Sequence, residues 1–539
     1  MGMTTDGLSY WQAESEGINL LDVTIGNLLD RRADELPTQE AIVYSCYPEI
    51  GDALDIRWTY QDYRDRANAV AKGLLALGLA NGDHIAVWAA NIPEWPILMM
   101  AAAKVWLVLV TINPVLQAAE VEYLLKQGDV QALFFMARVR TSDHLATVRS
   151  LITPGGKPGE VTSERLPRLR LLCLLGMPPT GLQELEGWRP ALLSEVAALG
   201  RQVSEATLAE RQAAVTPSDP AMLLYTSDTT GFPKGALLTH RGLLNNGWLI
   251  TRRWGLDQTD RFCLPTPFFH SKGVASILKT LVAGTTLHPL LAFDPQKVLQ
   301  IIGQERCTLF AGVPTMLSAL MQHPDFATAD LSSLKQVVSG GTPVPVALME
   351  RVKEQIGADV CISFGQTEGL MITQTLPDDP FERKAATVGI PLPHTEVKIV
   401  NPVTGDIVPC GERGELCCQG YLVMAGYYKM EDATAKAIDA EGWLHTGDLA
   451  TMDGRGYVNI VGRLKDMVIR GGENLFPREI EEFLIRHPKV ADVQVVGVPD
   501  AFFGEELLAV VIPKAGEPLT EQGVITFFRT VFPAKPSQD

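Results

Sequence analysis

A run of hydroxyl side chains that ends in a glycine and is followed by a lysine is suited to holding phosphate. After an apolar segment the chain reads Thr226, Ser227, Asp228, Thr229, Thr230 and Gly231. Lys234 follows three positions later. Hydroxyl and backbone N–H groups donate hydrogen bonds to phosphate oxygens, and a lysine adds a compact positive charge. The run lacks the Gly-Lys-Ser/Thr of a Walker loop, and a polar turn between two strands explains its composition equally well.

Three other short segments carry polar groups with both a functional and a structural interpretation. His270 follows two phenylalanines, where a core histidine is more common than a ligand contact. Gly340, Gly341 and Thr342 form a glycine-rich turn. Glu368 is either a solvated loop carboxylate or a ligand for Mg2+, which proteins commonly bind through a carboxylate together with phosphate oxygens. Taken one at a time, these segments do not identify a reaction.

The elements that must position these residues alternate between helices and short apolar strands. The pattern predicts helices at 68–79 and 94–104 and strands at 85–88 and 107–110. A strand–helix–strand order favours parallel sheets covered by helices, and binding sites in such folds lie at the carboxyl ends of the strands. We therefore predict an α/β fold with a large N-terminal domain of stacked sheets.

The sequence pattern changes near residue 393, where short predicted strands alternate with Gly and Pro turns. We predict a β-rich subdomain from about this point, within an adenylation domain that spans 1–462. A hinge at 463–466 and a small, mobile α+β domain at 467–539 complete the predicted organisation. The elements predicted in this last part are strands at 396–400 and 414–418, a helix at 477–486, and strands at 492–498 and 508–512.

The composition indicates a globular protein of more than one domain. Its 539 residues include 46 Lys and Arg against 63 Asp and Glu, a formal net charge of −17, so nucleic acid is a poor partner. The longest apolar region, 96–112, contains Lys104 and falls short of the ~20 residues of a spanning helix, so we expect no transmembrane segment. Eight cysteines without metal or redox spacing and an N-terminus without a signal pattern favour a cytoplasmic protein.

Considered together and in order, the segments resemble the signature motifs of the adenylate-forming, or AMP-binding, superfamily. Residues 227–235 are similar to Ser-Gly-Thr-Thr-Gly-x-Pro-Lys-Gly, and residues 364–368 to Tyr-Gly-x-Thr-Glu. Residues 443–448 resemble Trp-x-x-Thr-Gly-Asp, and residues 462–466 resemble the hinge motif. The resemblance extends from about residue 20 to about residue 528 and is strongest to medium- and long-chain fatty acyl-CoA synthetases.

The resemblance implies roles for the residues of the larger domain. The hydroxyl run and Lys234 would hold the phosphates of ATP, with Thr229 as a weak Mg2+ ligand. Thr367 would contact the α-phosphate, and Glu368 would hold Mg2+. His270 would lie at the mouth of the acyl pocket. The adenine would be bound by Phe364, Gly365, Gln366, Gly340, Gly341 and Thr342.

The resemblance also implies a sequence of two reactions. A carboxylate attacks the α-phosphate of ATP to give acyl-AMP, the C-terminal domain rotates about Lys465, and the thiol of coenzyme A then displaces AMP. Asp448 would bind the ribose hydroxyls, and Arg463 would contact ribose or phosphate. The segment implied to line the pantetheine tunnel contains Gly471, Gly472 and Glu473.

Two departures from the family pattern lead to specific expectations. Asp228 stands where the family has glycine, and like charges ~4 Å apart repel by about 4 kcal/mol at an effective dielectric of ~20, so we expect weak ATP binding. The family's late Gly-Lys element, whose lysine bridges carboxylate and α-phosphate, is not matched by Lys535. We therefore expect a truncated C-terminal domain and weak adenylation.

The sequence as a whole predicts an ATP-dependent fatty acid:CoA ligase that uses ATP, Mg2+ and coenzyme A on a small carboxylic acid. Two alternatives stay open. One is a degenerate protein that binds nucleotide or acyl ligands without turnover, and the other is an adenylating enzyme that loads a carrier protein. Competition between coenzyme A and a carrier protein as acyl acceptor would separate the second alternative from the ligase. The sequence leaves the acyl chain length and the oligomeric state open.

Overall fold

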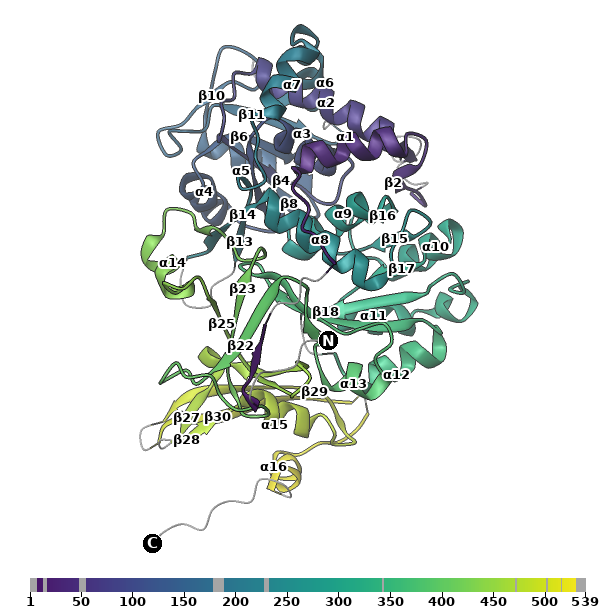
Figure 1. Ribbon diagram of the computed structural model, residues 1–539, viewed down its shortest axis with the longest axis vertical. Helices are drawn as coiled ribbons and strands as arrows, with labels where there is room; N and C mark the ends of the chain where they lie inside the picture. The colour runs from purple at the N-terminus through teal and green to yellow at the C-terminus, as the bar shows by residue number, and fades with distance from the viewer. Residues whose placement is uncertain are drawn as a thin grey trace. The chain divides into compact units, whose positions relative to one another are not determined.

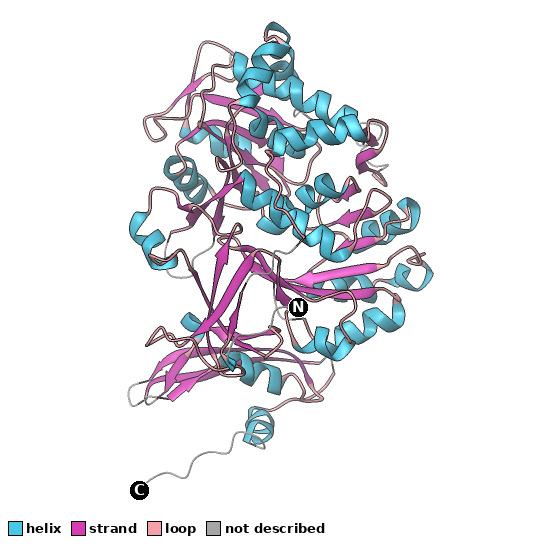
Figure 2. Ribbon diagram, viewed as in Figure 1, coloured by secondary structure: helices cyan, strands magenta, loops and turns pink. Residues whose placement is uncertain are grey.

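The computed structural model divides the chain into two compact units (Figures 1 and 2). It describes residues 7–12, 17–47, 55–177, 189–226, 232–341, 344–470, 473–500, 503–514 and 516–529. The larger unit comprises 13–395 and 419–444, and the smaller unit comprises 1–12, 396–418 and 445–539. The chain therefore passes between the units several times. The mixed α/β architecture confirms the predicted fold class.

The larger unit contains, within the described residues, an eight-stranded and a nine-stranded sheet. The order in the first sheet is β12 (Ala191–Leu192), β11 (Leu171–Leu175), β6 (Val130–Met136), β4 (His84–Trp88), β5 (Val108–Ile112), β13 (Pro220–Thr226), β14 (Lys234–Thr239) and β24 (Gly426–Tyr427). The order in the second sheet is β21 (Ile390–Pro391), β20 (Leu370–Gln374), β19 (Asp359–Gln366), β18 (Gln336–Gly340), β17 (Leu309–Ala311), β15 (Arg261–Leu264), β16 (Thr286–Pro289), β2 (Glu40–Tyr44) and β3 (Ile56–Thr59). The eight-stranded sheet is parallel from β12 to β13 and antiparallel at its β14–β24 edge, whereas the nine-stranded sheet is parallel in its centre and antiparallel at both edges.

The helices of the larger unit connect these strands and cover the sheets (Figure 2). They are α1 (Ile25–Glu35), α2 (Tyr60–Ala76), α3 (Glu94–Lys104), α4 (Ala118–Gln127), α5 (His144–Leu151), α6 (Leu193–Leu199), α7 (Glu205–Ala213), α8 (His240–Trp254), α9 (Ser271–Ala283), α10 (Pro295–Glu305), α11 (Pro314–Gln322), α12 (Val346–Gln355), α13 (Phe381–Ala386) and α14 (Glu431–Ala437). Each large sheet has its own apolar core, because parallel strands covered by helices are buried on both faces.

The smaller unit contains two sheets and two helices within the described residues. Its five-stranded sheet has the order β1 (Tyr10–Trp11), β22 (Thr395–Val400), β23 (Gly414–Gly420), β25 (Leu444–Met452) and β26 (Val458–Arg463). Its four-stranded sheet has the order β28 (Glu473–Leu475), β27 (Val468–Arg470), β30 (Gly504–Pro513) and β29 (Val490–Asp500), with α15 (Pro477–Leu484) and α16 (Glu521–Arg529). This is the β-rich and α+β character that the sequence predicts after residue 393.

The predicted elements agree with the structure to within a few residues, with one clear exception at α2. We predicted that this helix starts at residue 68, but it starts at Tyr60. Thr59 caps the helix: its hydroxyl accepts a hydrogen bond from the backbone N–H of Asp62, whose carboxylate accepts one from the N–H of Thr59. This reciprocal capping supports a first turn that the apolar pattern does not show. No helix in the described part of the chain is long and apolar enough to cross a membrane.

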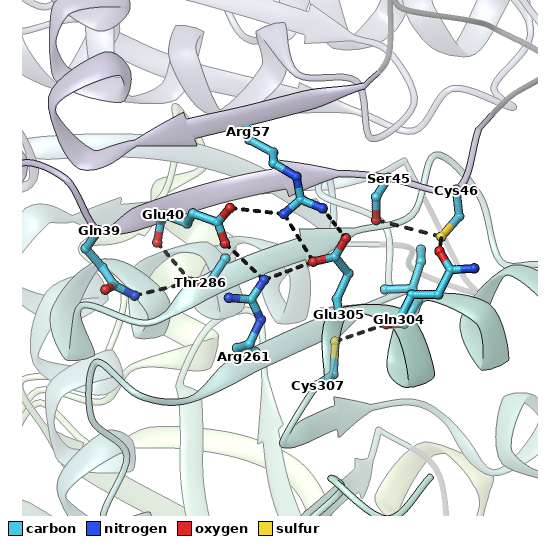
Figure 3. Close-up of polar contacts among 11 residues, drawn as sticks. Gln39, Glu40, Ser45, Cys46, Arg57, Arg261, Thr286, Gln304, Glu305 and Cys307 are labelled. Carbon is cyan, nitrogen blue, oxygen red and sulfur yellow. Dashed lines mark hydrogen bonds and ion pairs between the residues drawn. The ribbon is translucent and has the colours of Figure 1, made fainter. Parts of the chain in front are cut away.

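An ion-pair network connects the nine-stranded sheet to the end of α10 (Figure 3). The carboxylate of Glu305 accepts hydrogen bonds from Arg57 at 2.5 Å and from Arg261 at 3.0 Å, and both arginines also contact Glu40. Burial alone would raise the pKa of Glu305, but the hydrogen bond from Arg57 and the nearby positive charges outweigh it and hold the pKa below its usual value. The network stabilises the fold and lies outside the candidate site described below.

Candidate active site

In the larger unit β18 ends at a position that requires glycine, beside its parallel neighbour β19. Gly340 ends β18 beside Ser363 of β19, with a φ of 153°. A Cβ atom on Gly340 would lie 2.2 Å from the carbonyl oxygen of Ser363. Gly341 follows with a φ of 88°, and Thr342 lies outside the described residues. The backbones of β18 and β19 therefore lie close together at Gly340, and the turn that begins at Gly341 has no side chain at this position.

The end of β19 and the turn that leads into β20 carry five of the predicted residues. Phe364 and Gln366 are half-buried, and Gly365 between them is exposed. A Cβ atom on Gly365 would lie 2.0 Å from the carbonyl oxygen of Leu370, so glycine is required here too. The turn that follows contains Thr367 and Glu368. A half-buried aromatic ring beside a bare turn offers a flat apolar surface to a planar ligand.

Tyr427 connects two of the predicted residues that lie far apart in the sequence. Its hydroxyl donates a hydrogen bond to Glu368 Oε1 at 2.7 Å. The Nζ atom of Lys234 lies 5.3 Å from the centre of its ring, within the range of a cation–π contact. The backbone N–H of Met424 donates to the carbonyl oxygen of Glu368 at 2.8 Å and holds the turn in place. Lys234 and Glu368 are thus grouped around one tyrosine that the sequence analysis missed.

The phosphate-loop prediction falls mostly on residues that are not described. Thr226 and Lys234 are paired across β13 and β14, and the Thr226 hydroxyl lies 3.4 Å from the carbonyl oxygen of Lys234. Ser227, Asp228, Thr229, Thr230 and Gly231 lie outside the described residues. The structure therefore places the two ends of the predicted loop beside each other. The role of the residues between them remains a prediction.

His270 lies at the start of α9 and is exposed, so it is not the core histidine that its neighbours favour. Its ring accepts a hydrogen bond from the backbone N–H of Lys272, and desolvation and the Lys272 charge lower its pKa. The Nζ atom of Lys272 donates to the carbonyl oxygen of Gly340 at 3.2 Å. Desolvation lowers the pKa of Lys272 to about 8. Lys272 therefore connects the His270 segment to the glycine turn.

The smaller unit carries the remaining predicted residues. Asp448 is 3% exposed and pairs across β25 and β26 with Arg463, whose Nε atom donates to Asp448 Oδ1 at 2.9 Å. Lys465 is exposed in a short 3-10 turn that directly follows β26. Gly471 and Gly472 lie outside the described residues, and Glu473 is described only as the first residue of β28.

The donor set around Glu368 fits a Mg2+ ion that is shared with phosphate. Glu368 is half-buried, and one of its oxygens is already oriented by Tyr427. Mg2+ prefers oxygen ligands and is usually bound by one or two carboxylates together with substrate phosphates and water. Lys234, whose Nζ atom lies 5.3 Å from the centre of the Tyr427 ring, supplies a positive charge near the same tyrosine. Such groups at the carboxyl ends of parallel strands are typical of ligand sites in α/β proteins.

Comparison with known proteins identifies the family. The family model described as AMP-binding enzyme matches residues 29–428, and the model of the AMP-binding enzyme C-terminal domain matches residues 479–536. The chain therefore belongs to the AMP-binding enzyme family. It is an acyl-CoA synthetase, an AMP-forming acid–thiol ligase that acts on a carboxylic acid with ATP and coenzyme A. The match at 479–536 overturns our expectation that the C-terminal domain is truncated.

Relatives and solved structures of this family cover nearly the whole chain. "Putative acyl-CoA synthetase YngI" of Bacillus subtilis is 46% identical over 92% of this chain and 89% of its own length. Human "Medium-chain acyl-CoA ligase ACSF2, mitochondrial" is 36% identical over 97% of this chain and 84% of its own length. The fatty acyl-CoA synthetase of Mycobacterium tuberculosis has a TM-score of 0.68 and 29% identity, and covers 94% of this chain and 91% of that one. The anthranilate CoA ligase AuaEII in complex with anthranoyl-AMP has a TM-score of 0.78 and 25% identity, and covers 95% and 91%.

Proposed function

We propose that this enzyme is a medium- or long-chain fatty acid:CoA ligase that acts through an acyl-adenylate. The observation that carries the proposal is the grouping of Lys234 and Glu368 around Tyr427. Phe364, at the end of β19, and Thr367, in the turn that follows, directly precede Glu368 in the chain. The grouping supports the proposal because attack on a phosphate requires neutralisation of charge, which a lysine and a carboxylate able to hold Mg2+ would supply. The names of the relatives, an acyl-CoA synthetase and a medium-chain acyl-CoA ligase, support a fatty acid as the substrate.

The proposed roles of the larger unit are those implied by the family motifs. Lys234 neutralises charge on the phosphates of ATP, and the Thr367 hydroxyl donates to the α-phosphate. Glu368 holds Mg2+, which when bound withdraws electron density from the phosphate oxygens. Tyr427 fixes the orientation of the Glu368 carboxylate through its hydroxyl. The carboxylate oxygen of the acid forms a bond to the α-phosphorus as the bond to pyrophosphate breaks.

The smaller unit has its own proposed roles. The Asp448 carboxylate, oriented by Arg463, accepts hydrogen bonds from the ribose hydroxyls. A pair of vicinal hydroxyls suits a carboxylate because both of its oxygens accept.

We further propose the domain organisation given by the motifs: an adenylation domain at 1–462, a hinge at 463–466 with Lys465 as its pivot, and a C-terminal domain at 467–539. We retain the cytoplasmic location as a prediction.

The test is pyrophosphate release with MgATP and a panel of acids from butanoate to hexadecanoate, with thioester formation from synthetic acyl-AMP measured in parallel. We expect turnover in both assays, with the fastest release from medium or long acids. Fastest release with short or aromatic acids would overturn the substrate class. AMP binding without turnover in either assay would favour a binding protein instead. The variant Glu368→Gln should lower kcat/KM for adenylation about a hundredfold.

Asp228 gives the proposal a second test that depends on the sequence alone. The variant Asp228→Gly restores the residue of the family motif and removes one negative charge from the predicted phosphate loop. We expect it to lower KM for ATP, because a carboxylate repels the triphosphate. The step from acyl-AMP to thioester, which uses no triphosphate, should not change. An unchanged KM for ATP would show that Asp228 does not weaken nucleotide binding.

A further inference from the structure

Three potential metal ligands meet on one face of the five-stranded sheet in the smaller unit. Glu415 and Cys417 lie two residues apart on β23, so their side chains point to the same face. His445 lies on the neighbouring strand β25. Their ligand atoms all lie within 4.8 Å of one another, and no other group of this kind occurs in the described residues. Glu415 and Cys417 lie outside the motifs used above, and His445 occupies an unspecified position of the motif at 443–448.

The distances among these atoms resemble those of a metal coordination sphere. His445 Nδ1 lies 2.9 Å from Glu415 Oε2 and 3.4 Å from Cys417 Sγ. In a tetrahedral zinc site with Zn–N and Zn–O bonds of about 2.1 Å and a Zn–S bond of about 2.3 Å, nitrogen lies roughly 3.4 Å from oxygen and 3.6 Å from sulfur. For these two pairs, an outward movement of the carboxylate by about 0.5 Å and of the thiol by about 0.2 Å gives the zinc spacing.

The same geometry argues against a nucleophilic cysteine. In a cysteine–histidine–carboxylate triad the thiol and the carboxylate contact different ring nitrogens, so that the histidine can move a proton between them. Here Cys417 and Glu415 both contact Nδ1 of His445. Three donors that converge on one point suit a cation that all of them share. Thiolate, imidazole and carboxylate together select a borderline or soft transition metal rather than Mg2+ or Ca2+.

The surroundings of the trio favour a built site rather than an accidental cluster. Cys417 is fully buried, Glu415 is 8% exposed, and the side chain of His445 is about a third exposed, which leaves one side open to an entering ion. The second carboxylate oxygen, Glu415 Oε1, accepts a hydrogen bond from the backbone N–H of Gly447 at 3.0 Å. This bond fixes the carboxylate with Oε2 directed at the ring, as outer-shell hydrogen bonds do in known metal sites.

We propose that Glu415, Cys417 and His445 form a binding site for a divalent thiophilic cation of the zinc class. Three protein ligands leave the fourth tetrahedral position for water. Binding releases the thiol proton of Cys417 to solvent, since the thiolate is the ligand, and transfers no electron. The site lies three residues before Asp448 on the same strand, so the bound cation also restrains the backbone that carries Asp448.

The test is a titration of the chelator-treated full-length protein with Co2+, which reports thiolate ligation through a near-ultraviolet charge-transfer band. We expect one equivalent to bind, Zn2+ to displace it, and Cys417→Ser to remove the band and weaken Zn2+ binding more than about tenfold. Cys418→Ser is the matched control: it changes the adjacent buried cysteine, on the opposite face of β23, and should leave the titration unchanged.

A second variant keeps the proposal testable if Cys417→Ser does not fold. His445→Gln changes the most exposed of the three ligands and should also weaken Co2+ binding, with retention of the native circular dichroism spectrum. Proton release on addition of Zn2+ near neutral pH should accompany binding in the wild type. Absence of a thiolate band in the wild type, or equal loss in Cys417→Ser and Cys418→Ser, would overturn the proposal.

Discussion

At the scale of single residues, Tyr427 contacts two predicted site residues that lie far apart in the sequence. The hydroxyl and the ring of this tyrosine serve different neighbours, because the hydroxyl bonds to Glu368 while the ring faces Lys234. The two interactions can therefore be separated by substitution. Its neighbour Tyr428 has a comparable hydroxyl, but it donates to Asp129. The pair offers a variant and a control at adjacent positions.

The variant Tyr427→Phe keeps the ring and removes the hydroxyl. We expect kcat/KM for adenylation to fall about tenfold, or about 1.4 kcal/mol, because the Glu368 carboxylate loses the bond that orients it. Tyr428→Phe should leave adenylation unchanged. The measurement is pyrophosphate release at saturating acid over a range of MgATP concentrations. Equal effects of the two variants would show that Tyr427 acts only through folding.

Glu305 provides a prediction about stability and pH. Its folded-state pKa lies below the usual 4.5, so its contribution to stability is fully present above pH 4.5 and is lost as the pH falls through the folded-state pKa. We expect Glu305→Gln to lower the free energy of unfolding by about 2 kcal/mol at neutral pH. The deficit should shrink in acidic solution, as the pH falls through the folded-state pKa and the wild-type carboxylate takes up a proton. Urea unfolding at neutral and at acidic pH measures this, with exposed Glu354→Gln as the control.

At the scale of elements, the approach of β18 to β19 depends on one glycine. Gly340 has both a positive φ and a backbone oxygen 2.2 Å from where its Cβ would lie, whereas Gly341 has a positive φ and open space. Gly340→Ala should therefore cost backbone strain and steric displacement together, about 3 kcal/mol or more, and Gly341→Ala only strain of about 1 kcal/mol. Thermal unfolding compares the two variants, and equal shifts would contradict the steric argument.

Whether an element can be predicted from the sequence depends on whether the interactions that form it join residues close together in the chain. Helix α3 has the predicted ends, because its apolar run and its boundaries are all visible in the sequence. Tyr427 could not be found this way, since β24 has two residues and joins the site by pairing with Ala236 about 190 positions earlier. The Glu415–Cys417–His445 cluster was missed for the same reason, because two separate strands bring it together. Recognised motifs predicted the remaining site residues, but they carry no information on such pairings.

At the scale of the whole molecule, the smaller unit is assembled from both ends of the chain. Trp11 of β1 is 5% exposed, pairs with Val397, and packs so closely on Gly456 that a Cβ there would lie 2.1 Å from its ring. We expect Trp11→Ala to destabilise this unit by about 3 kcal/mol. Hydrogen exchange should then accelerate in β22 and not in β4. Tyr10→Phe, which removes only the hydrogen bond to Glu396, should have a smaller effect, and faster exchange throughout would contradict local destabilisation.

The pairing of β1 with β22 also fixes an order of events during synthesis. Tyr10 and its hydrogen-bond partner Glu396 are 386 residues apart in the chain. At translation rates of roughly 5–20 residues per second, the first strand leaves the ribosome roughly 20–80 s before its partner. Nearly all of the larger unit can fold in that interval, while β22, the strand with which Tyr10 and Trp11 pair, has not yet been synthesised. In the nascent chain the N-terminal strand is therefore among the last parts to be incorporated, although it is made first.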